Sequence, residues 1–123
     1  MTRSPATAHE LAQIALLAGL PGETLRELGQ RMERWEVAPG MPVVREGETG
    51  DRFFVILDGM LSVANRAMGA RDVLRAGDYF GEVAVTMDVP RTATVTAITP
   101  SVVASCDRAT FDELLRPLFA DDV

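Results

Sequence analysis

Residues 55–63 read VILDGMLSV and place the pair Asp58-Gly59 between two runs of β-prone residues. Asp-Gly is favoured in two-residue type I′ turns, because both central residues of that turn need a positive φ. The stretch therefore predicts a β-hairpin, and with it an antiparallel sheet.

Outward from this stretch, short β-branched or aromatic runs alternate with glycine-containing turns. Turn signals every ~8–12 residues are typical of an antiparallel sandwich or barrel, and not of βαβ units. The predicted strands cover Pro42 to Arg45, Arg52 to Leu57, Met60 to Asn65, Arg71 to Arg75, Thr92 to Ile98 and Val102 to Asp107. The central part of the chain is predicted to be a β-roll.

Two helices are predicted before the strands. Thr7 and Glu10 form a T-x-x-E capping box, which indicates a helix from about Thr7 to Leu17. A second helix follows the break at residues 19–22, where one apolar stripe contains Leu25, Leu28 and Met32.

A closing helix is predicted after the last strand. Asp107 is a suitable N-cap, and Phe111, Leu114 and Leu115 give an apolar stripe. Pro117 is expected to end the helix, because proline lacks the N–H that a helix interior uses. The predicted single domain comprises a helical segment (1–33), the β-roll (34–107) and a short C-terminal helix (108–123).

Composition excludes several classes of protein. The 123 residues are 47% hydrophobic and 24% charged, with a net charge of −6, which disfavours nucleic-acid binding. No apolar stretch is long enough for a membrane span, and Leu11–Leu20 fits a capped helix better than a signal peptide. The single cysteine, Cys106, excludes an intrachain disulfide and fits a reducing cytosol, so the expected location is the cytoplasm.

Enzymatic sites find little support. A jelly-roll metalloenzyme needs a histidine cluster, and the only histidine, His9, precedes the predicted roll. Cys106 lies within a predicted strand with no histidine near it in sequence, which favours a small core residue over a nucleophile or haem ligand. We therefore expect a protein that is not an enzyme and has no metal or cofactor.

Two segments interrupt the β pattern. Residues 80–87, FGEVAVTM, suit one turn of helix that begins near Gly81 and Glu82, and a helix N-terminus can bind an anion. Arg91 follows the turn at Pro90, and an arginine can grip a phosphate with two parallel hydrogen bonds. Taken singly, the segment is more often structural and the arginine more often a surface charge. Together they describe a cradle for one phosphate, with Glu82 free to accept from a hydroxyl.

The sequence FGEVAVTMDVPRTATV (residues 80–95) closely resembles the phosphate-binding cassette of the cyclic-nucleotide-binding domain family. That family includes catabolite activator proteins, protein kinase A regulatory subunits and cyclic-nucleotide-gated channels. Residues 39–59 also resemble the family, with its P-G, E-G-E, G-D and closing glycine in order. The resemblance covers about Leu11 to Leu118. It implies an antiparallel β-roll (a double-stranded jelly-roll barrel) flanked by N-terminal helices, a short cassette helix and a C-terminal helix.

The resemblance also implies roles for the cassette residues. Arg91 would pair with a phosphate oxygen, and Glu82 would accept from the ribose 2′-hydroxyl. Thr92 would lie under the phosphate and, in relatives that bind syn-guanine, contacts the base amino group. The backbone N–H groups that would bind phosphate and sugar are those around Gly81, Val83 and Ala84. Val44 and Val73 are candidate base contacts, whereas the glycines at positions 40, 47, 50 and 59 are expected at turns.

The implied function is that of a non-catalytic sensor for cyclic AMP or cyclic GMP. The ligand would act through the C-terminal helix on an output domain or partner protein, and a homodimer is one form this could take. Family members usually continue into a long lid helix, whereas this chain ends at Val123. The chain is then either a domain of a larger regulator or a module that uses a partner as its lid. The alternative function is a ligand-free β-roll that serves interaction or dimerisation.

Overall fold

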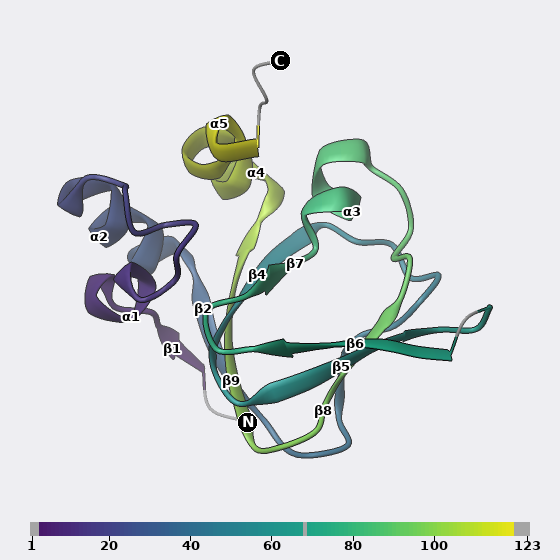
Figure 1. Ribbon diagram of the computed structural model, residues 1–123. Coiled ribbons are helices and arrows are strands. Elements are labelled where there is room, and N and C mark those ends of the chain that lie inside the picture. The colour runs from purple at the N-terminus through teal and green to yellow at the C-terminus, as the bar shows by residue number, and fades with distance from the viewer. Residues whose placement is uncertain (1–2, 68, 120–123) are drawn as a thin grey trace.

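The computed structural model describes residues 3–67 and 69–119, and these form two antiparallel sheets packed as a roll (Figure 1). The five-stranded sheet has the order β1-β2-β9-β4-β7, and the four-stranded sheet has the order β3-β8-β5-β6. The strands are β1 (Arg3–Pro5), β2 (Glu33–Val37), β3 (Pro42–Val44), β4 (Arg52–Asp58), β5 (Met60–Asn65), β6 (Gly69–Arg75), β7 (Tyr79–Phe80), β8 (Thr94–Ala97) and β9 (Ser101–Asp107). The mainly β fold class is confirmed.

The helices lie outside the roll (Figure 1). They are α1 (Ala8–Ala12), α2 (Gly22–Arg31), α3 (Glu82–Met87), and a C-terminal helix made of α4 (Arg108–Thr110), the π-helical segment η1 (Phe111–Leu115) and α5 (Arg116–Phe119). None of these helices, within the described ranges, is long and apolar enough to cross a membrane.

Strand β4 separates two hydrophobic cores. Phe53 and Val55 face the core that the helices cover, while Phe54 and Ile56 face the core between the two sheets. Successive side chains of a strand point to opposite faces, so a strand buried on both faces has a continuous apolar run. This explains why residues 53–56 are apolar without alternation.

The predicted β-hairpin at residues 55–63 is wrong. Strand β4 pairs with β7 and β9, whereas β5 pairs with β6 and β8, so the two strands belong to different sheets. Gly59 has φ +97°, but Asp58 does not have the positive φ that a type I′ turn requires. A Cβ on Gly59 would lie 2.7 Å from Cα of Ser101. The glycine therefore allows the chain to pass close to β9 as it moves from one sheet to the other.

Both terminal helices differ in length from the prediction. The capping box of Thr7 and Glu10 is present, but α1 ends at Ala12, and the chain then continues in turns rather than in a helix to Leu17. The C-terminal helix does not end at Pro117 and continues to Phe119. Pro117 is the second residue of α5, and a missing N–H is tolerated in the first turn of a helical segment.

Asp107 caps the C-terminal helix, as predicted, by accepting a hydrogen bond of 2.9 Å from the N–H of Thr110. This bond lowers the pKa of Asp107 below its usual 3.8. A lowered pKa means that the cap stabilises the fold above the usual pKa and that its contribution is lost as the pH falls through the folded-state value. We expect Asp107→Ala to lower the free energy of unfolding by about 1 kcal/mol at neutral pH.

Urea denaturation of both proteins across the acid range would measure this difference. It should shrink as the pH falls through the lowered pKa of Asp107, because the wild-type carboxylate then becomes protonated. Asp107→Asn provides the control, because its amide oxygen accepts the same bond at every pH. If the difference in free energy of unfolding between wild type and Asp107→Ala did not depend on pH, the charged carboxylate of Asp107 would not stabilise the fold as a cap.

Candidate functional site

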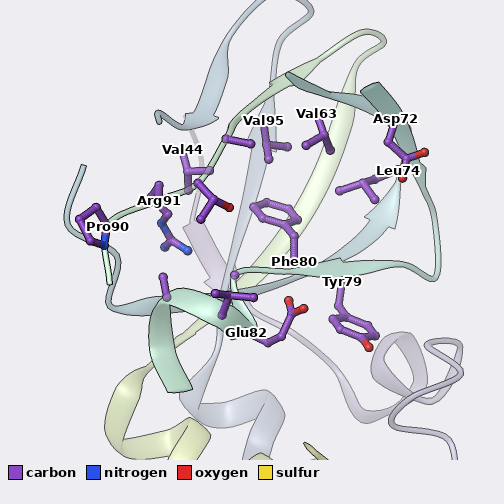
Figure 2. Close-up of a pocket in the computed structure, with 15 residues that line it drawn as sticks. Val44, Val63, Asp72, Leu74, Tyr79, Phe80, Glu82, Pro90, Arg91 and Val95 are labelled. Atoms are coloured by element: carbon purple, nitrogen blue, oxygen red, sulfur yellow. The ribbon is translucent and has the colours of Figure 1, made fainter. Parts of the chain in front are cut away.

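A cavity of about 260 Å³ lies between the start of α3 and the inner face of the four-stranded sheet (Figure 2). All six candidate site residues from the sequence line it: Gly81, Glu82, Val83, Ala84, Arg91 and Thr92. The structure thus brings the cassette helix and the arginine after Pro90 to one site, as the spacing predicted.

Arg91 is buried, with 8% of its surface exposed. Its Nη2 donates a hydrogen bond of 2.9 Å to the carbonyl oxygen of Arg52, and its guanidinium carbon lies 5.6 Å from the centre of the Phe54 ring. Nη1 is also buried and has no hydrogen-bond partner within the described residues. Burial lowers the pKa of Arg91, against the opposing effect of the carboxylates of Asp51 and Glu48. The site therefore holds a desolvated cation with an unused donor.

The backbone fixes the position of this arginine. The N–H of Arg91 donates to the carbonyl of Glu48 at 2.8 Å, and its own carbonyl accepts from the N–H of Gly47 at 2.9 Å. The adjacent residue, Pro90, forms a β-bridge with Thr49. These contacts hold the loop before β8 against the segment after β3. The backbone of Arg91 is thereby fixed, and its guanidinium extends into the cavity.

Two glycines make room for the guanidinium. A Cβ on Gly50 would lie 2.6 Å from Nε of Arg91, and a Cβ on Gly81 would lie 3.0 Å from its Nη1. Gly50 does not lie in a turn, so its predicted role as a turn glycine is wrong, and its role is to allow close approach. Gly81, in contrast, has φ +96° as the N-cap of α3.

The first turn of α3 faces the cavity without a side-chain cap. The N–H groups at the start of a helix have no partner within it, so these donors are open to an acceptor in the cavity. Glu82 is half-buried in this turn, and its carboxylate makes no hydrogen bond with the described part of the chain. The side chains of Arg91 and Glu82 both line this cavity beside the start of α3 (Figure 2).

The other end of α3 is tied to the C-terminal helix. The guanidinium of Arg108 donates to the carbonyl of Val85 and, at 3.1 Å, to a carboxylate oxygen of Asp88. The cassette helix is therefore in direct contact with the first residue of the C-terminal helix.

Pro90 and Ala93, in the loop before β8, also line the cavity. The sheets add six residues that the sequence did not single out as contacts: Val63, Asp72, Leu74, Tyr79, Phe80 and Val95 (Figure 2). Val44 lines the cavity as expected, but Val73 does not, whereas its neighbours Asp72 and Leu74 do. The alternation of β6 was the available signal, but it does not reveal which of the two faces points inward.

The described residues contain no group of three or more side chains suited to a metal ion. Cys106 is fully buried in β9, and burial raises the pKa of its thiol to about 12. A thiol with so high a pKa is not a nucleophile near neutral pH.

Comparison with known proteins agrees with this geometry. The family model described as "Cyclic nucleotide-binding domain" matches residues 34–117. A cAMP-dependent protein kinase regulatory subunit from Eremothecium gossypii is 38% identical over 108 residues, which is 88% of this chain and 24% of the relative. The chain thus spans about a quarter of that relative's length.

Solved structures give the same result. The regulatory domain of Toxoplasma gondii PKA, crystallised with cAMP, matches with a TM-score of 0.83 and 26% identity over 90% of this chain and 44% of that chain. The regulatory subunit of a cAMP-independent protein kinase A from Trypanosoma brucei matches with a TM-score of 0.85 and 28% identity, over 89% and 40% of the two chains.

Proposed function

Because the chain belongs to the cyclic nucleotide-binding domain family, whose members are non-catalytic regulatory domains, we propose that its cavity binds a 3′,5′-cyclic purine nucleotide, cAMP or cGMP. The observation that carries the proposal is the unpartnered Nη1 of Arg91 beside the uncapped start of α3. A buried donor without an acceptor is costly, and a ligand phosphate supplies the missing acceptor.

Each candidate residue has a role in the proposed complex. Arg91 pairs with a phosphate oxygen, and Glu82 accepts a hydrogen bond from the ribose 2′-hydroxyl. Thr92 lies at the phosphate end of the cavity. The backbone N–H groups that bind phosphate and sugar are those of Gly81, Val83 and Ala84. Support comes from the shared cavity, from the free carboxylate of Glu82 and from the buried guanidinium.

We propose that the ligand acts by shifting a conformational equilibrium that involves the C-terminal helix. The contacts of Arg108 with Val85 and Asp88 support this, because they connect the end of the cassette helix to that helix. The C-terminal helix would pass this change to an output domain or a partner protein. In the kinase regulatory subunits named above, that partner would be a catalytic subunit. A homodimer remains a prediction, as does a cytoplasmic location, which the unpaired thiol of Cys106 supports.

Calorimetric titration with cAMP, cGMP and 5′-AMP tests the proposal. We expect saturable binding of at least one cyclic nucleotide and weaker binding of 5′-AMP, whose phosphate is dianionic and is not held in a ring. If no cyclic nucleotide binds at millimolar concentration, the proposal fails for this chain. That result would favour the alternative of a ligand-free β-roll used for interaction.

The proposed role of Glu82 predicts a coupled loss of affinity. Hydrogen bonds to charged groups contribute about 1.5–3 kcal/mol, so 2′-deoxy-cAMP should bind wild type at least about tenfold more weakly than cAMP. Glu82→Ala should weaken cAMP binding by a similar factor but should bind both nucleotides nearly equally, because the partner of the hydroxyl is gone.

Glu36→Ala is the matched control, since it removes the same charge from an exposed residue of β2 that does not line this cavity. It should retain the discrimination between cAMP and 2′-deoxy-cAMP. If Glu82→Ala still binds 2′-deoxy-cAMP about tenfold more weakly than cAMP, the effects of removing the carboxylate and the hydroxyl are additive. The carboxylate then does not contact the hydroxyl.

A further inference from the structure

The cavity contains a third charged side chain that the proposed phosphate and ribose contacts do not use. Arg91 and Glu82 lie at the cassette, whereas Asp72 lies on β6 at the opposite end of the cavity (Figure 2). Val63, Leu74 and Phe80 form an apolar wall between them. Along the cavity, Arg91 and Glu82 at one end are thus separated by the apolar wall from Asp72 at the other end.

Asp72 is an exposed residue whose carboxylate hydrogen-bonds to its own strand. One oxygen of Asp72 accepts a hydrogen bond of 2.8 Å from the N–H of Val73, the next residue of β6. The other oxygen has no hydrogen-bond partner among the side chains that the structure describes, which do not include those of residues 70 and 71. Asp72 therefore offers one free acceptor and no donor.

From this arrangement we infer that Asp72 discriminates between purine bases and selects adenine. The inference rests on the proposed function, because it takes the phosphate to lie at Arg91 and the ribose at Glu82. A nucleotide held in this way directs its base along the apolar wall toward Leu74, and the edge of the base farthest from the ribose then reaches Asp72.

The two common purines differ at that edge. Adenine has an amino group at its 6-position, which donates a hydrogen bond to a carboxylate. Guanine and hypoxanthine have a carbonyl oxygen there, and two acceptors facing each other repel. Guanine would meet Asp72 favourably only if its base were rotated to present its N1–H and 2-amino group.

The test measures the affinities of cAMP, cGMP, cyclic IMP and the cyclic monophosphate of unsubstituted purine riboside for wild type and Asp72→Asn. Wild type should prefer cAMP to both cyclic IMP and the unsubstituted purine. In Asp72→Asn, the ratio of cAMP to cyclic IMP affinity should fall by roughly fivefold, because the amide can donate to the 6-carbonyl oxygen. Part of the fall should come from tighter binding of cyclic IMP.

Asp58→Asn is the matched control, because it removes the same charge from an exposed aspartate outside this cavity and should leave the ratio unchanged. The inference is overturned if Asp72→Asn leaves the ratio unchanged while cyclic nucleotides still bind, or if wild type prefers cGMP and loses that preference in Asp72→Asn. Absence of binding by every cyclic nucleotide would instead reject the proposed function itself.

Discussion

Arg91→Ala should weaken cyclic nucleotide binding by roughly ten- to a hundredfold, while the fold of the unliganded protein keeps its stability. Charge-assisted hydrogen bonds contribute about 1.5–3 kcal/mol each, and the variant removes the only buried arginine among the described residues. The unliganded protein, in contrast, stores a buried cation whose Nη1 is unpartnered and whose pKa is lowered by burial. Removal of such a group ends the cost of burying the cation, which offsets the loss of its hydrogen bond.

The measurement is a pair of thermal melts, with and without cAMP, beside a calorimetric titration. Wild type should show a ligand-dependent rise in Tm, and Arg91→Ala should lose this rise while its ligand-free Tm stays close to wild type. Arg91→Lys should recover only part of the affinity, because an ammonium group lacks the planar fork of a guanidinium. Arg26→Ala, which removes an exposed cation on α2, controls for net charge. Undiminished affinity in Arg91→Ala would remove the arginine from the binding site.

The second large effect is expected from Gly81→Ala. An alanine at φ +96° is strained by about 1–3 kcal/mol, and its Cβ would also lie 2.8 Å from the carbonyl oxygen of Arg52. That carbonyl accepts the hydrogen bond from Nη2 of Arg91, so any movement of the backbone there displaces the guanidinium. We expect a loss of about 2–4 kcal/mol in the free energy of unfolding, since overpacking adds to the strain, together with weaker nucleotide binding.

Gly77→Ala separates the two contributions. Gly77 has φ +98°, almost the same conformation, but a Cβ there would meet nothing within 4 Å. Gly77→Ala should therefore lose free energy of unfolding only through backbone strain, and its nucleotide affinity should equal that of wild type. Equal destabilisation of both variants, measured by urea denaturation, would show that the contact with Arg52 costs nothing.

Local signals in the sequence predicted local structure well. The capping box at Thr7, the N-cap at Asp107 and the start of α3 at Gly81 were all predicted, because each depends on residues within one helical turn. The pairing of β4 was not predictable in this way. An Asp-Gly pair signals a change of direction, but the close approach of Gly59 to Ser101 involves residues 42 positions apart in the chain, which no local signal contains.

The same distinction applies to the cavity. The six cassette residues lie within one continuous segment, so a motif could predict them together. The opposite wall is formed by side chains on several strands, and which of two alternating faces points inward is decided by pairing with distant strands. For this reason the expected contact of Val44 with the cavity was right, whereas that of Val73 was wrong. The edge strands β1 and β7 were missed because they are three and two residues long and carry no periodic pattern.

Tyr79 is the only tyrosine in the chain, and it lies in the cavity wall. Its ring also packs edge-on against Phe119 of α5, with the ring centroids 5.5 Å apart. The only tryptophan, Trp35, belongs to β2 and packs against the core between the sheets, so the two chromophores sample separate environments. The protein therefore carries an intrinsic optical reporter: near-ultraviolet tyrosine signals can register occupancy of the cavity and the placement of the C-terminal helix without any added label.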